Sequence, residues 1–100
     1  MLNPTPTDLR LDAHGRPYFL WDVDWSDERF RRELALADDG LRVELIAKLM
    51  RQAKPDDVFE YVQVSEVVRL WDRLSPRLGN QRPFWEWILG RWRELGHVQG

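Results

Sequence analysis

The residues of this chain with the clearest potential for chemistry are two aspartates one position apart, Asp22 and Asp24. They follow the apolar run Tyr18 to Trp21, and Ser26 comes two positions later. In a pair of this kind one carboxylate can attack a phosphorus atom, the other can transfer a proton, and a magnesium ion can neutralise the charge. That chemistry needs a parallel β-sheet to present the loop, and the sequence has no pattern for one. We therefore assign no catalytic role to this pair.

The same segment has two partial resemblances to acidic loops of known proteins. An apolar run followed by Asp-x-Asp-x-Ser resembles the nucleophile loop of haloacid-dehalogenase-type phosphatases, which also needs later lysine and acidic elements. Counted from the first aspartate, loop positions 1, 3, 5 and 12 match the oxygen ligands of a calcium-binding EF-hand. Those residues are Asp22, Asp24, Ser26 and Glu33. Position 6 is Asp27 instead of glycine and position 8 is Arg29 instead of an apolar residue, so we expect no metal site.

A structural role explains these acids more simply. Asp22 and Asp24 can accept hydrogen bonds from nearby N–H groups and shape a turn. Ser26 can cap a helix, and the two acids that follow it oppose the positive end of the helix dipole. Trp21 and Trp25 would then hold the turn against the core. If Trp21 is buried, Trp21→Ala should destabilise the fold by about 3–5 kcal/mol.

Other residue types that carry catalysis or bind cofactors form no motif. His14 and His97 stand 83 positions apart, without a matching serine or acid arrangement. The chain has no glycine-rich phosphate loop, no histidine pair with metal-ligand spacing and no cysteine. We predict a protein that is not an enzyme and that has no cofactor.

The composition indicates one small domain. With 100 residues, of which 43% are hydrophobic and 32% charged, the chain can bury a single modest core. It contains no signal-peptide pattern and no apolar run long enough to span a bilayer, so we expect a cytoplasmic protein. We expect a loose N-terminal arm over residues 1–16, a single helical domain over residues 17–96, and a C-terminal tail over residues 97–100.

Helical spacing predicts an all-α fold, a compact bundle of four to five short helices with an extended aromatic segment, Pro17 to Trp21, packed on it. The expected helix starts are Ser26, Asp38 or Asp39, Pro55, Ser65 and Pro83. Glu44 and Lys48 can pair on the outer face of the second helix. The last helix should end at Gly96, which suits the left-handed residue that follows a helix.

The tryptophan content predicts a binding surface. Six tryptophans exceed what so small a core can enclose, and Trp and Arg are enriched at binding hot spots. Apolar residues cover more than half of the helix over 83–95, so it is either the central helix or a helix with a second apolar face. The leading interface candidate is Trp87 with Arg91. Further candidates are Trp85, Trp92, Arg93 and Trp25.

The charge distribution leaves an alternative function open. Residues 1–68 hold 9 basic and 14 acidic groups, whereas residues 69–100 hold 6 basic and 3 acidic groups. The basic C-terminal third could serve a small nucleic-acid-binding regulator. Against that stand the overall charge of −2, the long joint at 75–83, and a tryptophan-rich final helix in place of a polar recognition helix.

Three segments together resemble a group of small bacterial proteins. They are Tyr18 to Asp22, read as Y-F-L-W-D, then Ile46 to Val58, and the aromatic helix Phe84 to Trp92. Genes of this group often stand beside nucleotidyltransferase-like toxins of the abortive-infection type. The resemblance implies an antitoxin-like protein that docks on and neutralises such a toxin. It supplies no catalytic residues, and the winged-helix DNA-binding part of better-known antitoxins is absent from this sequence.

Overall fold

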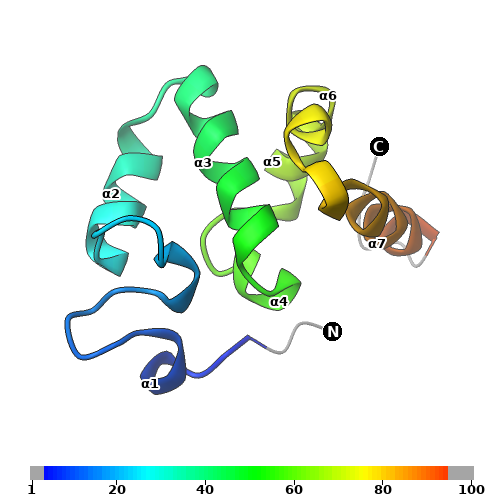
Figure 1. Ribbon diagram of the computed structural model, residues 1–100. Helices are drawn as coiled ribbons and strands as arrows, with labels where there is room; N and C mark the ends of the chain where they lie inside the picture. The colour runs from blue at the N-terminus through cyan, green and yellow to red at the C-terminus, as the bar shows by residue number, and fades with distance from the viewer. Residues whose placement is uncertain (1–3, 95–100) are drawn as a thin grey trace.

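The fold is all-α, as predicted. The computed structural model describes residues 4–94, and Figure 1 shows their arrangement. The α-helices are α1 (Thr7–Arg10), α2 (Asp27–Leu36), α3 (Asp39–Gln52), α4 (Pro55–Val58), α5 (Val64–Arg69), α6 (Trp71–Leu74) and α7 (Arg82–Glu94). The described residues also form three 3-10 turns: η1 (Tyr18–Leu20), η2 (Ser75–Arg77) and η3 (Gly79–Gln81). The predicted helix end at Gly96 and the tail at 97–100 lie outside the described residues.

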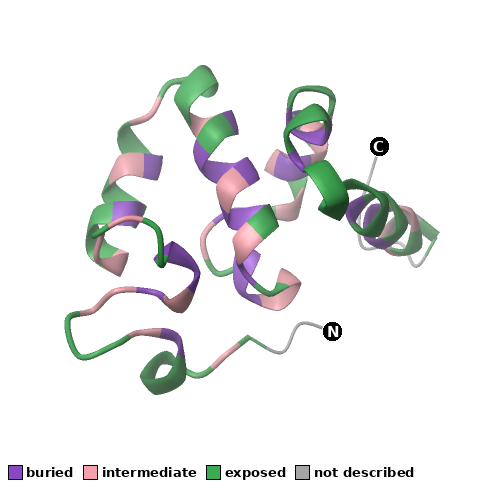
Figure 2. Ribbon diagram, viewed as in Figure 1, coloured by how far each residue is buried: buried purple, intermediate pink, exposed green. Residues whose placement is uncertain are grey.

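The central helix is α3, not the C-terminal helix. It contacts η1, α4, α6, η2 and η3, and in Figure 1 it stands between α2 on one side and α5 with α6 on the other. Figure 2 shows buried segments along much of its length. Its buried residues are Val43, Leu45, Ile46, Ala47, Leu49 and Met50. They occupy more than one side of the helix because α3 has neighbours on more than one side.

Local capping signals placed two helices correctly. The Ser26 hydroxyl accepts a hydrogen bond of 3.1 Å from the Arg29 N–H at the start of α2. Asp38 accepts one of 2.9 Å from the Leu41 N–H at the start of α3. The cap predicted at Ser65 is wrong, because α5 begins one residue earlier and Ser65 lies inside its first turn. The expected helix through this region is also divided at Leu70, which separates α5 from α6.

The predicted Glu44–Lys48 pair does not form. Lys48 pairs with Asp22, and Glu44 pairs with Arg77 at 3.0 Å. Both long side chains therefore connect α3 to other segments instead of to each other. An exposed pair within one helix is worth only a few tenths of a kcal/mol, so such competing partners readily replace it.

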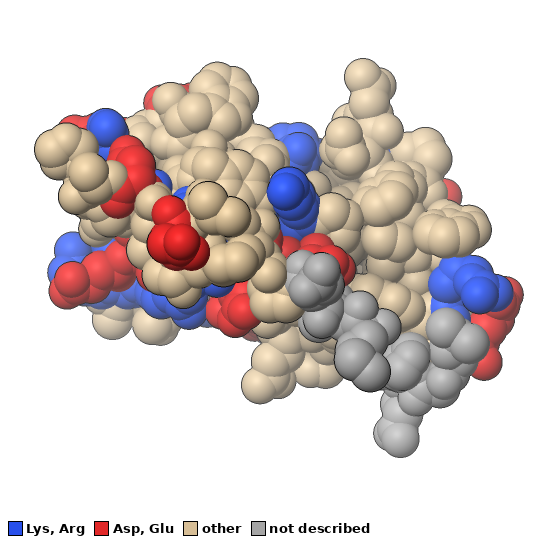
Figure 3. Space-filling view, turned by 90° about the horizontal axis from the view of Figure 1, so that it is seen from below, with Lys and Arg blue, Asp and Glu red and all other residues tan. Residues whose placement is uncertain are grey.

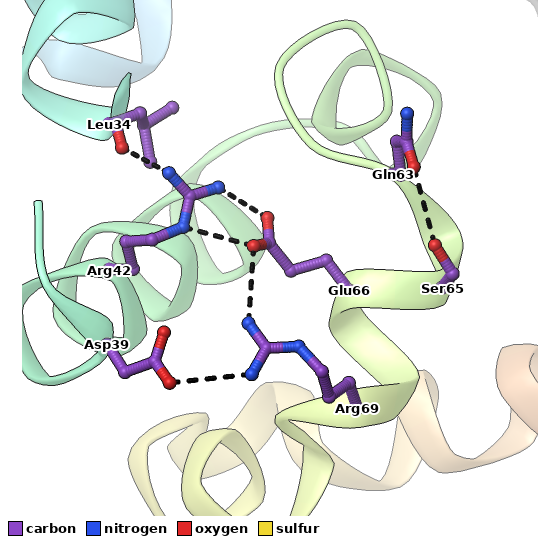
Figure 4. Close-up of polar contacts among 7 residues, drawn as sticks. All are labelled: Leu34, Asp39, Arg42, Gln63, Ser65, Glu66 and Arg69. Carbon is purple, nitrogen blue, oxygen red and sulfur yellow. Dashed lines mark hydrogen bonds and ion pairs between the residues drawn. The ribbon is translucent and has the colours of Figure 1, made fainter. Parts of the chain in front are cut away.

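A stronger ionic group holds α2, α3 and α5 together (Figure 4). The Arg42 guanidinium donates two hydrogen bonds to the Glu66 carboxylate, at 3.0 and 2.5 Å, and a third to the Leu34 carbonyl near the end of α2. Arg69 adds contacts to Asp39 at 3.4 Å and to Glu66 at 3.6 Å. Bidentate pairing of this kind fixes orientation as well as adding energy, so it sets the angles among the three helices.

Residues 4–16 of the predicted N-terminal arm are attached to the rest of the structure. Residues 4–16 contain α1 and a tight reversal in which Gly15 has a φ of 74° and Leu11 bridges to Pro17. Thr5 donates two hydrogen bonds to the buried Asp57 carboxylate, from its N–H at 2.6 Å and from its hydroxyl at 2.7 Å. These bonds tie the arm to α4, 52 positions further along the chain.

The aromatic segment that follows is a 3-10 turn, not an extended strand. In an extended segment Phe19 and Trp21 would share a face, because side chains alternate. The three-residue turn breaks that alternation, so Phe19 and Leu20 point into the core. Trp21 is 75% exposed, and the prediction that it anchors the fold is wrong.

Candidate protein-interaction surface

Helix α7 has a buried face and an aromatic exposed face. Trp85, Ile88 and Leu89 are buried, and the Trp85 indole N–H donates a hydrogen bond of 3.0 Å to the Met50 carbonyl at the end of α3. Trp92 is half-buried and meets the Phe59 ring edge-to-face with centroids 5.0 Å apart. Trp85 is therefore a core residue and not an interface residue, and most of Trp92 is used in packing.

The exposed face of α7 keeps the leading candidates together. Trp87 is 63% exposed, Phe84 is 41% exposed, and the Arg91 side chain is exposed. Positions 84, 87 and 91 are three, four and seven residues apart, so they lie on one side of a helix. We call these three residues the α7 patch. The described side chains do not include that of Arg93, which was a further candidate.

Arg91 is available to a partner. Its guanidinium pairs with Glu94 at 3.2 Å, but both side chains are at least half exposed. Such a surface pair contributes little stability and can exchange for a partner's carboxylate. The patch thus combines two aromatic rings with one cation, a composition typical of interface hot spots.

Gly90 lies on α7 three positions after Trp87 and is half-buried. A Cβ added there would meet no described atom within 4 Å, and its backbone is helical. Glycine in a helix interior is less stable than alanine by about 0.5–1 kcal/mol. The fold of the described residues therefore gives no reason for a glycine here, whereas close approach of another backbone would give one.

Trp25 is a weaker candidate than predicted. It is half-buried, packs against the core, and the Arg29 guanidinium lies over its ring at 4.6 Å from the centroid. Its two faces are thus largely occupied within the chain. Sequence reasoning overlooked Phe84 and Gly90, although their spacing from Trp87 on a helix could have indicated both.

The aspartates of the opening segment act as ion-pair partners. Asp22 pairs with Lys48, whose hydrogen bond lowers the pKa of the Asp22 carboxyl, and Asp24 pairs with Arg16 at 3.1 Å. Within residues 4–94 no group of three or more acidic, histidine or cysteine side chains is placed to hold a metal ion. His14 is exposed, and His97 lies outside the described residues.

The arginines of the C-terminal third mostly face carboxylates. Those in ion pairs are Arg69, Arg77, Arg82 and Arg91. Figure 3 shows basic and acidic side chains next to one another at both ends of the molecule, and most of that face is neither. The side chains seen there do not make a continuous basic field of the kind that draws nucleic acid.

Comparison with known proteins adds no relative. No family model, no curated protein and no solved structure matches the chain. Among the described helices, none combines the length and the apolar character needed to cross a membrane.

Proposed function

We propose that this chain is a non-enzymatic protein-binding module that acts in the cytoplasm and docks through the α7 patch. The observation that carries the proposal is the 63% exposure of Trp87 beside Phe84 and Arg91. Large aromatic side chains in water are unfavourable, and a tryptophan next to an arginine is the typical centre of an interface. The proposed partner surface is an apolar pocket with a carboxylate at its rim.

The resemblance to small bacterial proteins that are encoded beside abortive-infection-type toxins supports one kind of partner. An antitoxin-like role would place the α7 patch on a nucleotidyltransferase-type toxin. Occlusion of the toxin's nucleotide or substrate cleft is the simplest way to neutralise it. The role requires no catalytic residue from this chain.

The test is binding between this chain and the product of its neighbouring gene, which the proposal expects to be a nucleotidyltransferase-type toxin. Tagged chain should recover the toxin at low salt and inhibit its activity. Trp87→Ala should weaken binding by about 30-fold, which corresponds to the 2 kcal/mol expected for a hot-spot residue. Arg91→Ala should weaken binding less than Trp87→Ala does. In the free chain Arg91 already pairs with Glu94, and giving up that pair on binding offsets part of what Arg91 gains from the partner.

A matched control is Leu36→Ala, because Leu36 is 78% exposed and lies on α2, away from α7. This variant should bind like the parent chain. All three variants should keep the parent's melting temperature, since each removes an exposed side chain. Recovery of no toxin, or equal binding by Trp87→Ala and the parent, would refute the proposal.

A further inference from the structure

A second feature lies at the other end of the molecule, in a groove between α1 and η1. Its volume is about 330 Å³. Apolar side chains form much of its wall, and two of them are strongly exposed, Leu9 and Trp21. The remaining apolar wall residues are Leu11, Pro17, Leu20 and Val23.

Arg10 lines this groove and is only 8% exposed. Its Nε is fully enclosed and has no hydrogen-bond partner among the described residues. Its guanidinium makes no ion pair with any carboxylate of residues 4–94, and its Cζ lies over the Tyr61 ring, 5.7 Å from the centroid. A buried guanidinium normally has a hydrogen-bonded anion, because removing an unpaired charge from water is expensive.

The other charged groups of the groove are already paired. Arg16 pairs with Asp12 at 2.9 Å and with Asp24 at 3.1 Å. Asp57 lies in the same part of the core, but its oxygens accept hydrogen bonds from Thr5 and from the Tyr18 hydroxyl. The positive charge of Arg10 helps to lower the pKa of Asp57, but no ion pair or hydrogen bond joins these two side chains. Within the described part of the chain, Arg10 is thus the one charged side chain of the groove lining without a hydrogen-bonded partner, and its charge is positive.

We propose that this groove binds a small carboxylic acid with an apolar body. The carboxylate pairs with the Arg10 guanidinium, and the apolar part lies against Leu9 and Trp21. The volume suits one aromatic ring with a short side chain, at the lower end of the range for ligand pockets. A single unpaired cation beside apolar walls favours an organic monoanion over inorganic phosphate, which would leave the apolar walls uncovered.

The test uses the full chain and three matched probes: 3-phenylpropionate, its neutral amide, and acetate. Binding is followed by two-dimensional NMR of backbone amides and indole N–H groups. The acid should shift the signals of Leu9 and Trp21 and bind at least about tenfold more tightly than the amide, as one charge-assisted pair predicts. Acetate, which lacks the apolar body, should bind at least about tenfold more weakly than the acid.

Variants locate the site. Arg10→Gln should abolish the preference for acid over amide, whereas Arg32→Gln, a change at an exposed arginine of α2, should preserve it. If Arg10→Gln does not fold, Trp21→Ala decides, because Trp21 is exposed and its removal should weaken acid binding several-fold without unfolding the chain.

The inference would be overturned by equal affinity for the acid and the amide, or by NMR shifts confined to residues outside the groove. It would also be overturned if Trp21→Ala bound the acid as tightly as the parent chain does. A fourth contrary result would be tighter binding of a peptide that ends in a free phenylalanine carboxylate than of 3-phenylpropionate. The last result would assign the groove to a protein chain end. No toxin enters this experiment, so its outcome is independent of the α7 patch.

Discussion

Asp57 connects three distant parts of the chain, and its replacement by asparagine tests how the fold is held. The carboxylate is fully buried and accepts hydrogen bonds of 2.6 and 2.7 Å from Thr5 and of 2.6 Å from the Tyr18 hydroxyl. The same Tyr18 oxygen accepts a bond of 2.8 Å from the Lys54 N–H. Asp57→Asn keeps the shape of the side chain but replaces one acceptor oxygen with an NH₂ donor.

The geometry gives the size of the effect. Hydrogen bonds to a buried charged group contribute about 1.5–3 kcal/mol each, and bonds between neutral groups contribute about half as much. In the variant, the amide oxygen of the new side chain can keep the two bonds from the Thr5 and Tyr18 hydroxyls, which are weakened because the acceptor is now neutral. The NH₂ group of that side chain then faces the Thr5 N–H, so that third bond is lost. Burial of a neutral group in place of a charge offsets part of this loss. We expect Asp57→Asn to lower the free energy of unfolding by about 2–4 kcal/mol.

Urea unfolding followed by tryptophan fluorescence measures this loss. The matched control is Asp56→Asn, because Asp56 occupies the same first turn of α4 and accepts no side-chain hydrogen bond among the described contacts. Both variants lose the same favourable charge at the helix N-terminus, so their difference isolates the Asp57 contacts. Stabilities of the two variants that agree within about 0.5 kcal/mol would refute this reasoning.

The pH dependence gives a second readout of the same residue. Burial raises the pKa of Asp57, but the hydrogen bonds from Thr5 and Tyr18 outweigh it and hold the pKa below its ordinary value of 3.8. A lowered folded pKa stabilises the protein above the unfolded pKa, and this stabilisation is lost as the pH falls through the folded pKa. The stability difference between the parent and Asp57→Asn should thus be constant from about pH 6 to 8 and shrink below about pH 4.

Three further predictions concern the aromatic segment and α7. Phe19→Ala should lower the free energy of unfolding by about 3–5 kcal/mol, whereas Trp21→Ala should change it by less than about 0.5 kcal/mol in the same urea experiment. Gly90→Ala should raise stability by about 0.5–1 kcal/mol, visible as a higher melting temperature. Burial and the hydrogen bond to Asp57 raise the pKa of Tyr18 to about 12. The contribution of Tyr18 to folding stability is therefore fully present below the unfolded-state pKa of 10.0 and is lost as the pH rises above about 12. The native protein should therefore show little tyrosinate absorbance at pH 10, since the pKa of the other tyrosine is raised as well.

The features that the sequence could predict are those set by near neighbours in the chain. The caps at Ser26 and Asp38 involve an N–H three residues away, and Pro55 begins α4 because a proline loses nothing at a first helical position. Trp87 was the leading interface candidate because the helix over 83–95 carries more apolar residues than one buried face can take, and its side chain is 63% exposed.

The features that the sequence could not predict depend on distant partners. Lys48 has an acid four residues before it but pairs with Asp22, 26 positions away. The Asp57 contacts join residues 39 and 52 positions apart, and no local pattern marks them. Trp21 was misplaced for a related reason: one 3-10 turn changes which side chains face the core, and aromatic composition does not distinguish this turn from a strand.

The α7 patch and Gly90 together separate stability from function. Gly90→Ala should stabilise the isolated chain, because nothing described opposes the added methyl group. If a partner's backbone approaches α7 beside Trp87, the same methyl group should weaken the complex, and the two effects would have opposite signs. A surface change that merely stabilised the fold would leave binding unchanged or improve it slightly. We would therefore measure both the melting temperature and the partner affinity of Gly90→Ala. A higher melting temperature with weaker binding would indicate a glycine that is needed for docking. Binding as tight as that of the parent chain would show that Gly90 has no role in docking and would leave Trp87 and Arg91 as the centre of the surface.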